Sequence, residues 1–264
     1  PDIVVSFVCR INLIVIISKL LSHLKTRLVI SERNDPRFDG RGKISSYMAK
    51  RLYKKADLLI CQTKRQMSFF PKNVQAKTII IKNPIDIKAP IINFECKKNI
   101  IINAARYDES KNQILLLRAF EKIVLLGKNH GFSLHFYGTG TVKEILKKYV
   151  NNHGLSKYVY INESVRNIQE KISEASIFCL SSNYEGMSNS LMEALLLGTA
   201  CISTDVSGAE DLIVDGENGF IVPVGEENCL FDKLLFLIES KACRQKFYEY
   251  NTSATFQKQF NEPI

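Results

Sequence analysis

Two glutamates separated by seven residues, Glu185 and Glu193, mark the stretch of this sequence whose residue types and spacing could do chemistry. An apolar run precedes them, a turn follows at Gly186, and leucines at helical spacing continue until Gly198. A strand, a tight turn and a helix start leave backbone N–H groups unpaired, and the helix dipole favours negative charge there. The amides that would bind an anion such as phosphate belong to Met187, Ser188, Asn189 and Ser190.

The two carboxylates need a different kind of partner, because a carboxylate beside a phosphate repels it unless it accepts hydrogen bonds from hydroxyl groups. If the backbone were helical throughout, Glu185 and Glu193 would lie at most ~12 Å apart. They could then bracket a diphosphate and bind a sugar on either side of it. A plainer interpretation stays open, in which Glu185 complements the helix N-terminus and Glu193 is a solvated helix position.

Two further segments have plain interpretations on their own. Arg106 and Lys111 lie in a turn after another apolar run, where a lone Arg/Lys turn is most simply a solvated surface pair. Gly138 and Gly140 end a third apolar run, where a tight turn from strand to helix explains them. No Asp-x-Asp triplet occurs, so nothing suggests a diphosphate held by a metal.

Short apolar segments alternate with longer amphipathic ones along the chain, which predicts parallel sheets covered by helices on both faces. The expected strands span residues 3–8, 28–31, 58–61, 78–81, 100–104, 133–137, 159–161, 177–180, 200–204 and 220–222. So many strands exceed the usual single sheet, and the two prolines within residues 83–90 cannot continue a central strand. The sequence therefore predicts an α/β fold with a unit at 1–82, a linker at 83–95, a second unit at 96–250 and a tail at 251–264.

The first unit looks incomplete. A doubly wound domain that binds nucleotides usually opens with a strand, a glycine-rich turn and a helix, but the first glycine here is Gly40. A truncated copy of a larger domain explains this pattern better than a small natural domain. Glu32 and Arg33 follow an expected strand, and we expect them to pair with each other rather than face the site.

Composition excludes several classes of protein. The 264 residues carry a formal net charge of +9 and are 45% hydrophobic, unlike a disordered or fibrous chain. The charge suggests an anionic partner, but no block of like charges marks a nucleic-acid arm. A basic helical pattern around Tyr53 could face anionic lipid, although a solvated face fits better. No apolar run is long enough for a membrane span, and no secretory signal opens the chain. The seven scattered cysteines fit a reducing cytoplasm.

The Glu185-x7-Glu193 spacing resembles the E-x7-E motif of the family 4 retaining glycosyltransferases. Other segments agree with that family in order and distance, namely residues 82–86, 105–112, 136–140, 204–211 and 215–223. The resemblance implies two Rossmann-like domains facing a cleft, the GT-B architecture, with the first domain incomplete. The sequence departs from the family pattern at residues 31–33. Many members have a histidine after the corresponding strand, whereas this sequence has Ser-Glu-Arg, so the residues that would act on the acceptor stay unassigned.

The resemblance also implies a role for each candidate residue. Arg106 and Lys111 would grip the donor diphosphate as catalytic groups, and Glu185 would contact the donor sugar. Glu193 would accept hydrogen bonds from the ribose hydroxyls. The remaining donor-binding positions would be Gly138, Gly140, Gly186, Met187, Ser188, Asn189 and Ser190.

The activity implied is transfer of a hexose-type sugar from a nucleoside diphosphate sugar, foremost a UDP-sugar, with retention of configuration. The acceptor would be a glycan or a polyprenyl-linked glycan in cell-surface polysaccharide synthesis. The enzyme would be cytoplasmic, with peripheral contact with the anionic inner face of the membrane as an option, and would need no cofactor, metal or nucleic acid. Two alternatives stay open: a nucleotide-sugar binding fragment without turnover, and a two-domain UDP-sugar epimerase.

Overall fold

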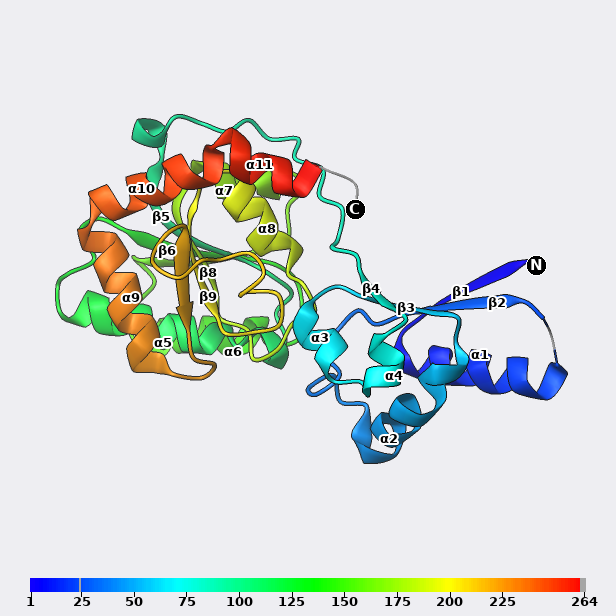
Figure 1. Ribbon diagram of the computed structural model, residues 1–264. Helices are drawn as coiled ribbons and strands as arrows, with labels where there is room; N and C mark the ends of the chain where they lie inside the picture. The colour runs from blue at the N-terminus through cyan, green and yellow to red at the C-terminus, as the bar shows by residue number, and fades with distance from the viewer. Residues whose placement is uncertain (24, 262–264) are drawn as a thin grey trace. The chain divides into compact units, whose positions relative to one another are not determined.

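The computed structural model describes residues 1–23 and 25–261, and these residues form two compact α/β units. The first unit comprises Pro1–Asn83 together with the short segment Tyr184–Met187. The second comprises Pro84–Asn183 and resumes at Ser188. Figure 1 shows the elements of each unit, with the first in blue and cyan.

The first unit is built on a parallel sheet with strand order β1-β2-β3-β4. Leu28, Ile30 and Leu59 on its central strands are fully buried and pack with Tyr53 and Phe70. The elements in chain order are β1 (Ile3–Phe7), α1 (Cys9–Ser22), β2 (Arg27–Ser31), α2 (Gly42–Leu52), η1 (Tyr53–Lys55), β3 (Leu58–Cys61), α3 (Lys64–Ser68), α4 (Lys72–Gln75) and β4 (Thr78–Ile80).

The second unit holds a parallel six-stranded sheet with strand order β10-β9-β8-β5-β6-β7. Its elements are η2 (Phe94–Cys96), β5 (Lys98–Ala104), η3 (Glu109–Lys111), α5 (Gln113–Leu125), β6 (Ser133–Tyr137), α6 (Lys143–Asn152), β7 (Val159–Asn162), α7 (Ile168–Glu174), β8 (Ala175–Leu180), α8 (Asn189–Leu196), β9 (Ala200–Thr204), β10 (Gly219–Val222), α9 (Glu227–Glu239), α10 (Lys241–Thr252) and α11 (Ala254–Asn261). Helices α5 and α6 cover one face of this sheet, and α7 and α8 cover the other (Figure 1).

The strand order of the second unit reverses between β5 and β8. From β5 the chain moves outward through β6 and β7, then returns to pair β8 with the other edge of β5. Open α/β sheets bind ligands beyond the carboxyl ends of the strands at such a switch point. The loops that follow Ala104 and Leu180 therefore occupy the place where this fold presents a site.

A half-buried lysine, Lys97, contacts the two helices that flank this point. Lys97 Nζ donates to the carbonyl oxygen of Ser173 (2.8 Å), near the end of α7, and to that of Leu197 (3.4 Å), just after α8. It also donates to Thr199 Oγ1 (3.1 Å). Burial lowers the pKa of Lys97 to about 8. Its ammonium group satisfies carbonyls that helix ends leave unpaired.

The strand predictions are confirmed for all ten segments, and only their ends differ, by at most two residues. β5 and β8 begin earlier than expected, at Lys98 and Ala175, because sheet pairing extends beyond the apolar run. The predicted tail, residues 251–264, is helical through Asn261. Phe256 on α11 is buried, and Gln257 donates to the carbonyl oxygen of Leu196 (3.0 Å), so α11 packs against the end of α8. Among the described residues, no helix is long and apolar enough to cross a membrane.

Candidate active site

The helix predicted after the first glutamate begins later than expected. Ser188 is its N-cap, with extended backbone, and its Oγ accepts a hydrogen bond from Leu191 N (3.4 Å). The helix then buries Leu191 and Leu195 and ends before Gly198, which has the left-handed φ of +67° that suits glycine. The ~12 Å bound, which supposed a helical backbone from residue 185 to residue 193, does not apply, because α8 begins only at Asn189.

The glutamate before the helix lies in a separate segment. Glu185, Gly186 and Met187 are all buried, and they belong to the segment Tyr184–Met187 that groups with the first unit. The donor-sugar role of Glu185 stays a prediction. Ser188, Asn189 and the rest of α8 belong to the second unit.

The turn that carries Arg106 and Lys111 is a short loop that follows β5. Asp108 precedes η3 and accepts a hydrogen bond from Ser110 N (2.9 Å), which fixes the turn that carries Lys111. Arg106 is 78% exposed at its side chain and lies 3.4 Å from Asp108 Oδ2. An exposed pair of this kind contributes little to stability, so the guanidinium can change partner at small cost.

Four hydrogen bonds join this turn to the segment just before α8, although about 70 residues separate them in sequence. Asn183 N donates to the carbonyl oxygen of Ser110 (2.7 Å), and Ser181 Oγ donates to that of Lys111 (3.0 Å). Asn183 Nδ2 also donates to the carbonyl oxygen of Glu109 (3.0 Å), and Asn112 Nδ2 donates to Asn183 Oδ1 (2.9 Å). The structure thus brings the loop of Arg106 and Lys111 beside the strand end that leads into α8.

The two glycines after β6 serve close packing of backbone on backbone. A Cβ on Gly138 would overlap the carbonyl oxygen of Ala105, and one on Gly140 would overlap that of Tyr107. The same loops are joined by a hydrogen bond from Tyr107 N to the carbonyl oxygen of Thr139 (2.8 Å). The structure therefore supports the tight-turn interpretation of both glycines, and their contact with a nucleotide stays a prediction.

Alanine at position 138 should destabilise the second unit by about 1–3 kcal/mol, because the added methyl group must displace the β5 loop backbone. Urea denaturation followed by circular dichroism measures the change. Thr139→Ala, at an exposed neighbouring position, is the control and should change the unfolding free energy by less than about 0.5 kcal/mol. Equal stability of the two variants would contradict the packing role.

The second glutamate of the motif lines a cavity of about 480 Å³ in the second unit. Glu193 is half-buried there, and its Oε1 accepts a hydrogen bond from Gln169 Nε2 (3.1 Å). Burial raises the pKa of the Glu193 carboxyl above its usual value, and the bond from Gln169 partly offsets this. Arg166 and Asp86 lie on the same cavity wall, so a cation and carboxylates face one space.

Gln169 is a further candidate site residue, which the sequence did not indicate. Its Nε2 also donates to the carbonyl oxygen of Asp86 (2.9 Å), while its Oε1 accepts from Lys88 N (2.9 Å). The side chain therefore holds the segment after Asn83 against the glutamate. It lies on the seven-residue helix α7, where no motif or spacing marks it.

The polar residues after β2 form a different pair from the one expected. The expectation that Glu32 pairs with Arg33 is wrong: Glu32 Oε2 lies 2.6 Å from an Arg41 nitrogen, and Arg33 donates to Asn83 Oδ1 (2.6 Å). Glu32 is 1% exposed, and Tyr53 Oη also donates to it (2.5 Å). Burial raises the pKa of Glu32 even though Arg41 and Tyr53 act to lower it.

The turn at residues 215–223 has a structural role. Asn218 is fully buried, donates to the carbonyl oxygen of Leu212 (3.1 Å) and contacts Asn251 on α10 (3.2 Å). Asp215 Oδ1 accepts from Ile221 N (2.9 Å). These bonds hold the loop before β10 and keep it folded onto α10. Among the described residues, no group of three or more His, Cys, Asp and Glu side chains could hold a metal ion.

Comparison with solved structures identifies the fold class of the chain. TarM of Staphylococcus aureus matches with a TM-score of 0.79 at 21% identity, over 95% of this chain and 50% of that one. Anabaena HepE in complex with UDP and glucose matches with a TM-score of 0.78 at 17% identity, over 98% of this chain and 76% of that one. Two parallel α/β units with this topology define the GT-B class of glycosyltransferase folds, and the predicted fold class is confirmed.

The family model described as "Glycosyl transferases group 1" matches residues 85–254, and the chain belongs to this family. A Campylobacter jejuni relative is 28% identical over 97% of this chain and 72% of its own length. It is named N-acetylgalactosamine-N,N'-diacetylbacillosaminyl-diphospho-undecaprenol 4-alpha-N-acetylgalactosaminyltransferase. A S. aureus poly(ribitol-phosphate) alpha-N-acetylglucosaminyltransferase is 23% identical over 88% of this chain, which spans about half (49%) of that relative. The recognised family and the glycosyltransferase class are confirmed, and neither alternative function gains support.

Proposed function

We propose that this chain belongs to a retaining sugar transferase that takes a hexose-type sugar from a UDP-sugar. The sugar passes to a glycan or a polyprenyl-diphosphate glycan in cell-surface polysaccharide synthesis. The observation that carries the proposal is the set of four hydrogen bonds between the Arg106–Lys111 turn and the segment before α8. These bonds support a diphosphate site, because they hold the turn of Arg106 and Lys111 beside the strand end that leads towards α8, at the switch point of the sheet.

The positively charged groups of the site stabilise the leaving group in this proposal. Arg106 and Lys111 stabilise the negative charge that develops on the departing UDP, and the amides at Ser188 and Asn189 add the positive end of the helix dipole. No metal or cofactor is required in this scheme, because the chain's own cations neutralise the leaving group. The catalytic contribution is charge stabilisation plus positioning of the donor sugar, in which Glu185 takes part.

The nucleoside half of the donor fits the cavity beside α7. Glu193 accepts hydrogen bonds from the ribose hydroxyls, and Gln169 holds its carboxylate in place. Hydroxyl donors are the partners that a half-buried carboxylate needs, whereas a phosphate there would be repelled. UDP is bound in solved structures of similar fold, including HepE with glucose and the pneumococcal O-GlcNAc transferase GtfA with GlcNAc, and this favours a uridine donor.

The acceptor class follows from the relatives. Two Campylobacter relatives are named for acceptors carried on a diphosphate-linked undecaprenol, and others are named for poly(ribitol-phosphate) and poly(glycerol-phosphate). These acceptors all carry phosphate esters. We infer a cytoplasmic enzyme with peripheral contact at the inner face of the membrane, because an acceptor linked to undecaprenol, as in the names of two relatives, is held at a membrane.

A ligand-detected NMR screen over UDP-, GDP- and ADP-sugars tests the proposal. Saturation transfer should reach the uridine and sugar protons of a UDP-sugar, and added UDP should displace them. Hydrolysis of the bound sugar nucleotide, in which water takes the sugar and UDP is released, then measures turnover. Absence of binding by all three sugar nucleotides would refute the donor site.

Glu193→Ala should weaken UDP binding about tenfold or more, because hydrogen bonds to a charged group contribute roughly 1.5–3 kcal/mol. The loss should be much smaller for 2′,3′-dideoxy-UDP, which lacks the hydroxyls that this glutamate is proposed to bind. Isothermal titration calorimetry of both ligands on both proteins measures the difference. Equal losses for the two nucleotides would show that Glu193 does not contact the ribose.

A further inference from the structure

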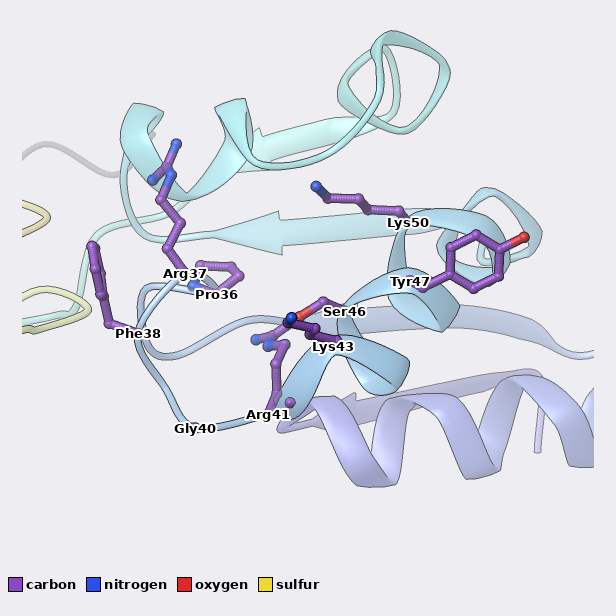
Figure 2. Close-up of a pocket in the computed structure, with 10 residues that line it drawn as sticks. Pro36, Arg37, Phe38, Gly40, Arg41, Lys43, Ser46, Tyr47 and Lys50 are labelled. Atoms are coloured by element: carbon purple, nitrogen blue, oxygen red, sulfur yellow. The ribbon is translucent and has the colours of Figure 1, made fainter.

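A second cavity lies in the first unit, at the start of α2, and has a volume of about 570 Å³. We call it the α2 pocket. Its lining residues come from the loop before α2 and from that helix itself, as far as Lys50 (Figure 2). The charged and hydroxyl side chains among them are Arg37, Arg41, Lys43, Ser46, Tyr47 and Lys50, and no carboxylate lines the pocket.

The two arginines are held in place from outside the pocket. Arg41 makes ion pairs with Glu32 (2.6 Å) and Asp39 (2.5 Å), and its side chain is only 3% exposed. Arg37 lies 3.3 Å from Asp35 and donates to Ser68 Oγ (2.7 Å). The pocket wall is therefore fixed before any ligand arrives. The carboxylates that neutralise these arginines are not among the lining residues.

The two lysines carry charge that no described carboxylate neutralises. Among the described residues, neither Lys43 nor Lys50 makes an ion pair, and both are exposed. Lys50 Nζ lies over the ring of Phe69, 4.2 Å from its centroid. That contact directs the lysine without cancelling its charge, because a ring face attracts a cation through its quadrupole.

The start of α2 adds to this positive field. The N-cap position, Arg41, gives no side-chain hydrogen bond to the helix, and the first turn contains no acidic residue. Cations at a helix N-terminus oppose the helix dipole, which prefers an anion there. An anion in the pocket would relieve this repulsion and bind the lysines together with the unpaired amides of the first turn.

We propose that the α2 pocket binds the phosphate groups of the acceptor, as a diphosphate ester. This inference rests on the proposed function, because it assigns a place in the first unit to the acceptor class inferred above. Lys43 and Lys50 neutralise the diphosphate, and the hydroxyl of Ser46 can donate to its oxygens. The cavity is larger than a diphosphate requires, so it leaves room for the first sugar or the lipid attached to it.

The test is calorimetry with inorganic pyrophosphate as the probe, on the chain saturated with UDP so that the donor site is blocked. The double variant Lys43→Ala/Lys50→Ala should bind pyrophosphate at least tenfold more weakly than the original chain. Lys54→Ala/Lys55→Ala is the matched control, because it removes the same charge from exposed positions outside the pocket and should bind normally. Equal weakening in both variants, or no pyrophosphate binding by the original chain, would overturn the proposal.

A second arm separates the acceptor from the membrane surface. The same variants are sedimented with vesicles of phosphatidylglycerol and of phosphatidylcholine. If the pocket variant loses only its binding to phosphatidylglycerol vesicles while pyrophosphate binding is unchanged, the lysines bind lipid headgroups and the acceptor proposal is wrong. Failure of the donor site is recognised separately, because UDP binding to the original chain is measured first.

Discussion

Replacing Arg106 or Lys111 by alanine is expected to lower the rate of UDP release from a UDP-sugar by about 10²-fold or more. Both residues lie on the turn that hydrogen bonds to the segment before α8. Removing one group that stabilises developing negative charge typically costs about 10²–10³ in rate. The loss should appear mainly in kcat, because the charge on the diphosphate grows as the sugar departs.

The matched control for this pair is Lys147→Ala, which removes an exposed cation paired with Glu144 on α6 (2.9 Å). It should leave both kcat and UDP affinity within about twofold, because exposed pairs contribute little. Calorimetry with UDP reports the ground-state contribution of each cation separately. If Arg106→Ala and Lys111→Ala both keep normal rates and normal UDP affinity, the proposed diphosphate site is wrong.

Arg41→Ala is expected to lower the free energy of unfolding of the first unit by about 3–5 kcal/mol. Its side chain is 3% exposed and pairs with Glu32 and Asp39, so its removal leaves two carboxylates without their cation, one of them fully buried. Breaking a buried pair from one side costs this much because the remaining charge stays desolvated. Urea denaturation followed by circular dichroism measures the change.

Glu32→Gln should cost much less than Arg41→Ala. Glutamine keeps the shape and can still accept from Tyr53 Oη, and Arg41 keeps Asp39 as its partner. The double variant Glu32→Gln/Arg41→Met should recover part of the stability lost in the arginine variant, because it leaves one buried charge fewer. If Arg41→Ala unfolds at the same urea concentration as the original chain, this ion pair does not hold the loop before α2.

The sequence alone determined the fold to a large extent. β-branched runs such as the three isoleucines at residues 100–102 predict buried parallel strands, because a parallel sheet is covered by helices on both faces. Apolar periodicity is local information, so strand identity and approximate ends could be read directly. Strand order could not, because the return of the chain from β7 to the far side of β5 depends on contacts between distant segments.

Part of the candidate site could likewise be predicted from the sequence, and part could not. Arg106, Lys111 and Glu193 could be selected from spacing and charge, and so could the helix N-terminus at Ser188. The hydrogen bonds by which Ser181 and Asn183 join the turn to the segment before α8 exist only in the folded sheet.

Tertiary structure alone decided the partners of the buried polar groups. Glu32 pairs with Arg41 rather than with its neighbour Arg33, because a desolvated carboxylate requires the cation that the fold delivers into the same interior. Gln169 joins the site for a similar reason: its amide satisfies Glu193 and the backbone near Asp86 at once. Charge, apolar pattern and glycine spacing are properties of the sequence. Which groups meet inside is set by packing, since burial makes an unpaired charge or amide too costly to leave.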